Sequence, residues 1–322
     1  MVGRASTDGE KKADLVLEGG GVKGIGLLGA VLTLADAGYS FPRVAGTSAG
    51  AIVAALVAAY QTAGLDLHDL EEVMRRVDYT RFEDGPLLEK LTGPLGEGAD
   101  LLLHEGMHSG DYLEEWLGPE LEKAGVTTFE QLRIHDPGSS LQPYQSYSLV
   151  VHVSDLTRGV LVRLPWDYGQ YAAKADEQRV VDAVRASMSI PFYFRPVQMH
   201  TDRGTATWVD GGLLSNFPIT AFDRTDGQQG RWPTWGVKLS GVPKDAPDRP
   251  VRTALGMATK CLETLTGDWN RYRLDDEGVN RRTIYVNTDG VSATDFSLSS
   301  ATRERLYESG QEAARAFIAL QH

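Results

Sequence analysis

The chain has 322 residues, of which 44 are acidic and 32 are basic, so its formal net charge at pH 7 is −12. This balance argues against nucleic acid as the main partner and against strong long-range attraction to anionic membranes, and it leaves room for a peripheral membrane contact through local patches. The single cysteine, Cys261, excludes an intrachain disulfide and a cysteine-based metal cluster, and it is typical of a reducing compartment.

The N-terminal segment, residues 1–12, carries no apolar run of the kind that a signal peptide needs, and we expect it to be a disordered tail. The most apolar helical stretch, residues 49–59, is too short to span a bilayer. No convincing linker divides the remainder. The sequence therefore predicts a cytoplasmic protein without a transmembrane segment, with a single domain over residues 13–322.

The first predicted elements are a strand, a glycine-rich turn and a helix. Asp14–Glu18 is short, apolar and β-branched in its middle, as is typical of a buried strand. It leads into the turn GGGVKG, residues 19–24, and Ile25–Ala37 then places apolar side chains on one helical face until Gly38 ends the helix. Successive glycine N–H groups that enter the first turn of a helix form an electropositive concavity, which suits an oxyanion.

Ser48 stands in a second turn, GTSAG (residues 46–50), between a short buried strand end and an alanine-rich helix over residues 49–60. Two interpretations fit this turn. In a nucleophile elbow, small residues at 46 and 50 let the backbone fold back sharply and lift the serine Oγ clear of the sheet, at the positive end of the helix dipole. In the other interpretation the serine is a helix N-cap and the glycines serve close packing.

The rest of the chain alternates helical and strand patterns. The expected elements are a helix over residues 67–77, a helix over Tyr112–Ala124, a hairpin of Tyr147–Val153 and Gly159–Leu164, a helix over Val180–Met188, a strand that ends at Asp210, strands at Trp235–Leu239 and Thr283–Val286, a helix over Ala254–Leu265, and a C-terminal helix within Phe296–Leu320 with Ser299 or Ser300 as N-cap. This alternation predicts a three-layer α/β/α domain with a largely parallel central sheet. The apolar, glycine-punctuated segment Pro86–Gly110 fits either an irregular core excursion or a mobile cover over an apolar substrate site.

The turn at residues 19–24 also matches the dinucleotide pattern GxGxxG. That interpretation requires an acidic residue about 20 positions further on, at the end of the second strand, and none closes that strand here. Lys23 opposes the dipole of the helix that it begins, so helix stability does not explain it. It either complements a phosphate or carboxylate held nearby or is simply solvated.

An activated serine needs a base. The α/β-hydrolase order would place a histidine late in the chain, and only the terminal His322 follows Asp210. His200 with Asp155 would be another choice, although His200 lies in a predicted exposed turn. Asp210 leaves a strand through two glycines, and a carboxylate in a partly dry site can act directly as a base. Taken alone, this Asp-Gly-Gly also fits an ordinary β-turn.

The chain resembles the patatin-like phospholipase family in four motifs, which are residues 19–24, 46–50, 186–196 (ASMSIPFYFRP) and 210–212. The resemblance covers most of residues 13–220. It departs at Lys23, where many members have arginine, and at Gly212, where many have alanine, and neither change removes a catalytic group. The C-terminal third matches no motif of the family.

The resemblance implies a hydrolase of lipid acyl esters, of phospholipase A or lysophospholipase type, that uses a Ser-Asp dyad without metal, cofactor or catalytic histidine. By position, Ser48 corresponds to the nucleophile and Asp210 to the base. The amides implied for the oxyanion hole are those of Gly19, Gly20, Gly21 and Ala49. The predicted substrate-binding residues are Lys23, Pro191, Phe192 and Phe194, the last three along an acyl groove.

Two other functions fit the same residues. One is an acyltransferase that passes the same acyl-enzyme to an acceptor other than water. The other is a catalytically silent protein that binds lipid or nucleotide. For a lipid or lysophospholipid substrate, the acidic net charge favours zwitterionic lipid, lysolipid or a soluble ester over anionic bilayers.

Overall fold

The computed structural model describes residues 11–83, 110–136, 141–191, 193–226, 228, 230–239, 277–293 and 295–321. The predicted helix that contains Cys261, nearly all of Pro86–Gly110, and Phe192 lie outside these described residues. Within the described part of the chain, none of the helices combines the length and the apolar character that a bilayer crossing requires.

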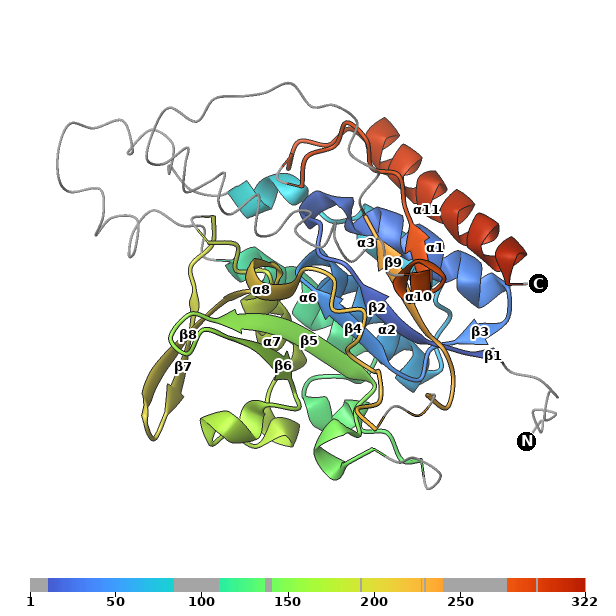
Figure 1. Ribbon diagram of the computed structural model, residues 1–322. Coiled ribbons are helices and arrows are strands. Elements are labelled where there is room, and N and C mark those ends of the chain that lie inside the picture. Colours follow the sequence, from blue (N-terminus) through green and yellow to red (C-terminus); the bar gives the residue numbers. More distant parts are fainter. Residues whose placement is uncertain are drawn as a thin grey trace, which may run out of the picture.

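An eight-stranded sheet forms the centre of the domain (Figure 1). Its strand order is β10-β9-β2-β4-β5-β8-β7, and β6 also pairs with β5. The strands are β2 (Asp14–Leu17), β4 (Val44–Thr47), β5 (Leu149–Asp155), β6 (Val160–Leu164), β7 (Val197–Thr201), β8 (Gly204–Asp210), β9 (Thr234–Lys238) and β10 (Thr283–Tyr285). The five strands from β10 to β5 are parallel, whereas β6, β7 and β8 pair antiparallel. The predicted largely parallel sheet and the predicted hairpin, β5 with β6, are confirmed.

Helices cover the sheet and complete the fold. They are α1 (Gly24–Asp36), α2 (Ala49–Ala63), α3 (Asp69–Arg75), α6 (Asp111–Lys123), α7 (Val180–Ser187), α8 (Gly212–Ser215), α10 (Glu277–Asn280) and α11 (Ser300–Leu320). Helix α2 packs on β2, β4 and β5 and contacts α6 and α7, while α11 lies along α1 (Figure 1). Ser299 caps α11, because its Oγ accepts a hydrogen bond from Thr302 N at 3.1 Å.

Alternate residues along the strands point to opposite layers. At Gly46 of β4, a Cβ would lie 2.2 Å from Gly50 O of α2, so this face of the sheet meets α2. At Gly236 of β9, a Cβ would lie 2.3 Å from the ring of Phe217, in the segment that follows α8. The sheet is therefore covered on both faces, and the predicted three-layer α/β/α architecture is confirmed.

Three strands were not expected: β7, which includes His200 where a turn was predicted, and two very short ones. Lys11 and Lys12, which we expected to belong to the tail, form β1 (Lys11–Lys12), and β1 pairs in parallel with β3 (Tyr39–Ser40). Strand β3 follows α1 directly after Gly38, and it gives β1 a strand to pair with. The ordered fold thus begins at least two residues before the predicted boundary.

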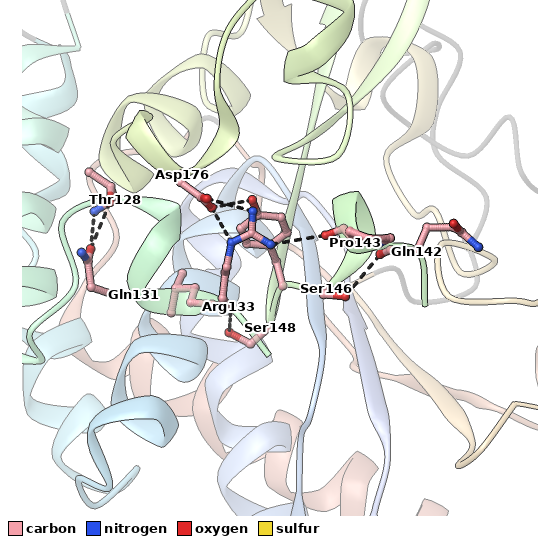
Figure 2. A network of polar contacts seen from close by, with 10 residues as sticks. Thr128, Gln131, Arg133, Gln142, Pro143, Ser146, Ser148 and Asp176 are labelled. Carbon is pink, nitrogen blue, oxygen red and sulfur yellow. Dashed lines mark hydrogen bonds and ion pairs between the residues drawn. The ribbon is translucent and has the colours of Figure 1, made fainter. Parts of the chain in front are cut away.

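A polar network ties down the loops at the amino end of β5 (Figure 2). Arg133 donates two hydrogen bonds to the carboxylate of Asp176, at 2.7 and 2.8 Å, and its guanidinium lies 4.6 Å from the centre of the Tyr147 ring. The Tyr147 hydroxyl donates to the same carboxylate at 2.7 Å, and Ser148 Oγ donates to Leu132 O at 3.2 Å. These contacts hold the start of β5, and its other end reaches the site described next.

Candidate active site

Ser48 occupies a sharp turn between the carboxyl end of β4 and the start of α2. Its backbone has φ 52° and ψ −127°, a region that non-glycine residues rarely adopt. A Cβ at Gly46 would lie 2.2 Å from Gly50 O, and one at Gly50 would lie 2.3 Å from Leu17 O. The flanking glycines are therefore required by close backbone approach. Ser48 stands at the N-cap position but its side chain makes no capping hydrogen bond, so capping does not explain a serine here.

Asp210 reaches the same end of the sheet from a distant part of the sequence. It ends β8, where it pairs with Val153 of β5, and β5 lies beside β4. The side chain is buried, and its Oδ1 accepts a hydrogen bond from Gly212 N at 2.7 Å. Among the described residues, its Oδ2 has no hydrogen-bond partner although it is shielded from solvent. One oxygen of this carboxylate thus accepts a hydrogen bond, and the other accepts none from the described residues.

Burial raises the pKa of Asp210 to about 7, and the nearby Ser48 hydroxyl and the hydrogen bond from the Gly212 amide oppose the rise. The Ser48 hydroxyl also lies 3.6 Å, Oγ to Sδ, from Met188, whose thioether is only a weak acceptor. The structure therefore brings Ser48 and Asp210 together, and the carboxylate is the stronger base within reach of the hydroxyl.

The glycine turn at residues 19–24 lies against this pair. Gly20 (φ −168°) and Gly21 (φ 56°) lead into a 3₁₀ turn, η1 (Gly21–Lys23), and then into α1. A Cβ at Gly21 would lie 1.9 Å from Ala293 O, so no side chain fits there. In the part of the chain that the structure describes, the N–H groups of Gly20, Gly21 and Ala49 have no hydrogen-bond acceptor. Three of the four predicted oxyanion amides are thus available.

Gly19 corrects the prediction for the fourth amide. Its N–H donates to Asn216 O at 3.1 Å, so it is not available to an oxyanion. Asn216 Nδ2 in turn donates to Gly19 O at 3.0 Å. A Cβ at Gly19 would lie 2.2 Å from Asn216 Oδ1, and one at Gly212 would lie 2.8 Å from the same atom. Asn216, which sequence reasoning missed, holds the glycine turn beside the turn that follows Asp210, and only its position six residues after Asp210 hinted at this.

Lys23 is not simply solvated, and the charge nearest to it in the structure is a carboxylate of the protein itself. Its Nζ is 3.4 Å from Thr288 Oγ1, beyond the end of β10. Burial lowers the pKa of Lys23, and the charge of the buried Glu18 opposes this. Glu18 is itself paired with the buried Lys238, Nζ to Oε1 at 3.0 Å. Lys23, which is itself half-buried, thus lies near the buried Glu18–Lys238 pair and does not line the cavity beside Ser48.

An apolar cavity opens beside Ser48. It is lined by residues that include Ala49, Ile52, Met74, Trp116, Met188 and Phe194. Its volume is only about 20 Å³, roughly the space that one water molecule needs. Of the predicted groove residues, Phe194 lines this cavity together with Ile190, whereas Pro191 does not. A bound chain must therefore displace lining side chains.

The alternative pair of His200 and Asp155 is not assembled. His200 is exposed on β7, with Nδ1 3.0 Å from Thr205 Oγ1. Asp155 is buried and accepts a hydrogen bond from the Tyr171 hydroxyl at 2.7 Å. The buried His152 places Nδ1 3.3 Å from Gly46 O, and burial lowers its pKa to about 4. Among the described histidines, none is hydrogen-bonded to Ser48 or Asp210.

Comparison with known proteins identifies the family. The model of the family described as "Patatin-like phospholipase" matches residues 15–223. A curated relative, the uncharacterized protein YqhO of Bacillus subtilis (strain 168), is 34% identical over 305 residues, which cover 95% of this chain and 97% of that protein. This chain belongs to the patatin-like phospholipase family, whose members are lipid hydrolases.

Solved structures agree on the fold. VipD from Legionella pneumophila is 20% identical with a TM-score of 0.51, over 98% of this chain and 67% of that chain. ExoU, in its heterodimeric complex with SpcU from the type III secretion system of Pseudomonas aeruginosa, is 20% identical with a TM-score of 0.52, over 95% of this chain and 51% of that chain. At this identity the likeness concerns the fold, and this chain spans about half the length of the ExoU chain.

Proposed function

We propose that the protein hydrolyses acyl esters of lipids, as a phospholipase A or lysophospholipase, with Ser48 as nucleophile and Asp210 as base. The observation that carries the proposal is the state of Asp210. It is a buried carboxylate with one unused oxygen and a pKa raised to about 7, next to a serine at the start of a helix. A base whose pKa lies near the working pH combines a useful ionised fraction with good proton affinity.

The reaction begins when the hydroxyl of Ser48 turns from Met188 to Asp210 Oδ2. Asp210 takes the proton while Oγ attacks the ester carbonyl carbon, which forms a tetrahedral oxyanion. The N–H groups of Gly20, Gly21 and Ala49 are the donors with capacity to bind that oxyanion, and loss of one such donor costs about 3 kcal/mol in comparable sites.

Collapse of the intermediate breaks the ester C–O bond. The leaving alcohol or lysophospholipid takes the proton from Asp210, and the acyl group remains on Ser48 Oγ. Asp210, ionised again, takes a proton from a water molecule that attacks the acyl-enzyme, and the fatty acid leaves as Oγ regains a proton. The apolar cavity beside Ala49 and Met188 is the place for the acyl chain, which makes lipid esters better substrates than polar ones.

A fluorophosphonate probe tests the nucleophile. Intact-mass measurement should find one adduct on the wild-type protein and none on Ser48→Ala. His200→Ala is the matched control for the rejected base, and it should label at the wild-type rate because His200 lies away from the site. An adduct that survives in Ser48→Ala, or a wild-type protein that never labels and cleaves no lysophospholipid, would contradict the proposal.

Product analysis then separates hydrolysis from transfer. With a lysophospholipid as substrate, free fatty acid should be the main product even when an acceptor alcohol such as glycerol is added. An acylated acceptor as the main product would instead favour an acyltransferase that uses the same acyl-enzyme.

A further inference from the structure

Ser187, the last residue of α7, makes a hydrogen-bonded bridge behind the nucleophile. Its side chain is fully buried. Its Oγ accepts a hydrogen bond from Ser48 N at 2.9 Å and donates one to His152 O at 2.7 Å. One hydroxyl therefore uses its donor and one acceptor position to join the Ser48 turn to strand β5.

The bridge also reaches the turn that follows the proposed base. His152 O, which accepts the hydrogen bond from Ser187, lies against Gly211, where a Cβ would be 2.3 Å away. Gly211 directly follows Asp210. The carbonyl that Ser187 binds thus packs against the backbone next to the carboxylate, and the same hydroxyl binds the backbone of the nucleophile.

The Ser48 turn needs such a support. Its φ of 52° is a strained conformation for serine, and strained residues persist only where their surroundings hold them. Because Ser48 is buried, water cannot replace a lost partner of its N–H group. Among the described residues, Ser187 Oγ is the acceptor that this N–H has.

We propose that Ser187 is a positioning residue, whose hydroxyl holds the Ser48 turn in the conformation that keeps Oγ within reach of Asp210. Its effect on turnover rests on the proposed function, whereas its effect on the backbone of Ser48 does not. A substrate contact is not involved, because Ser187 does not line the apolar cavity.

Ser189 offers a matched control two residues away. It is equally buried, and its Oγ accepts from Arg185 Nη1 at 2.6 Å and donates to Arg185 O at 3.0 Å. Removal of its hydroxyl therefore costs two buried hydrogen bonds, as at Ser187, without a change to any bond of Ser48. A general loss of stability should appear in both variants, and a loss of protection at the Ser48 amide only in Ser187→Ala.

The first measurement does not depend on activity. Hydrogen–deuterium exchange, resolved to the Ser48 amide by fragmentation, should be at least about tenfold faster in Ser187→Ala than in the wild-type protein, and unchanged in Ser189→Ala. Equal protection of the Ser48 amide in wild-type protein and Ser187→Ala would overturn the proposal, whether or not the protein proves to be a hydrolase.

The second measurement follows the chemistry with a soluble p-nitrophenyl ester. Ser187→Ala should lower kcat by about 100-fold with KM within about twofold, since a displaced nucleophile slows the chemical step and leaves binding intact. Ser187→Cys fills nearly the same space with a weak hydrogen-bonding group, so its kcat should be lowered about as much as that of Ser187→Ala. A Cys variant with wild-type kcat would overturn the proposal by showing that packing alone suffices.

Discussion

Two buried aspartates at opposite ends of the sheet show how differently one side chain can be held. Asp14 begins β2 and is fully buried, with both carboxylate oxygens bound by the guanidinium of Arg43, from Nε at 3.0 Å and from Nη2. Asp210 ends β8 and is also buried, but no cation pairs with it among the described residues, and one oxygen is unused. The first carboxylate is saturated and so structural, while the second keeps the capacity to take a proton.

Two serines that begin helices repeat the contrast. Ser299 has extended backbone, φ −66° and ψ 154°, and its Oγ caps α11. Ser48 has φ 52°, makes no capping bond, and leaves its Oγ for other contacts. In both pairs the side chain of the structural residue is hydrogen-bonded within its own helix end or ion pair. The side chain of the proposed catalytic residue has no such bond, so it keeps a polar atom for other contacts. The following predictions test this difference.

The largest expected effect is on turnover in Asp210→Asn. Because the amide cannot accept the Ser48 proton as a base, kcat should fall by about 10⁴-fold, the order seen when a catalytic carboxylate is removed. Hydrolysis of a soluble ester measures it. Asp14→Asn is the control, and per folded molecule it should keep kcat within about threefold. A variant of Asp210 with more than a tenth of wild-type kcat would remove the distinction between the two aspartates.

The second effect is on stability as a function of pH. Burial raises the folded-state pKa of Asp210 to about 7, so the folded state holds a proton that the unfolded state releases near pH 4. Between these values the unfolded state binds fewer protons, and the free energy of unfolding falls as pH rises. The free energy of unfolding of Asp210→Asn, measured with urea, should therefore rise relative to that of the wild-type protein by up to about 4 kcal/mol between pH 4 and pH 8. A constant difference over that range would mean that the pKa of Asp210 is not raised.

Asp14→Asn, in contrast, should lower the free energy of unfolding. It leaves the buried guanidinium of Arg43 without its counter-ion, and loss of one partner of a buried pair costs about 3 kcal/mol or more. Denaturation at pH 8 measures the loss. If Asp14→Asn were as stable as the wild-type protein, the Arg43 pair would not be the support that its geometry indicates.

The pH dependence of the reaction is the fourth test. With Asp210 acting as an ionised base, kcat/KM should fall about tenfold for each pH unit below about 7, or about 100-fold at pH 5, and should be level above pH 8. Rates on a neutral soluble ester isolate this limb. If kcat/KM instead fell only below about pH 4, the base would be a carboxyl with an ordinary pKa. If the fall near pH 7 persisted in Asp210→Asn, it would belong to another group.

The smallest effect belongs to the capping serine. Ser299→Ala removes the bond to Thr302 N and should lower the free energy of unfolding by about 1 kcal/mol, with kcat unchanged. Ser48→Ala should show the reverse, with no labelling and little change in stability, because its hydroxyl caps nothing. Thermal unfolding of both variants compares them, and a larger stability loss in Ser48→Ala than in Ser299→Ala would contradict the contrast.

Much of the fold was predictable because it depends on local patterns. The strand before Gly19, the helices after residues 24 and 48, the hairpin of β5 and β6, and the C-terminal helix all follow from apolar periodicity and glycine punctuation. The cap at Ser299 was one of two predicted positions. Strands β1, β3 and β7 were missed, since short edge strands form only when a packed neighbour offers a ladder.

By itself the sequence determined which residues can turn sharply and which carry reactive groups, because steric limits at Gly46 and Gly50 and the chemistry of Ser48 and Asp210 are properties of those residues. Only the tertiary structure decided their partners. Strand order set β8 beside β5 and so brought Asp210 to Ser48, Asn216 took the amide of Gly19, and Lys23 turned to Thr288. The reason is that burial and hydrogen bonding depend on what packs around a group, and residues far apart in the chain supply those surroundings.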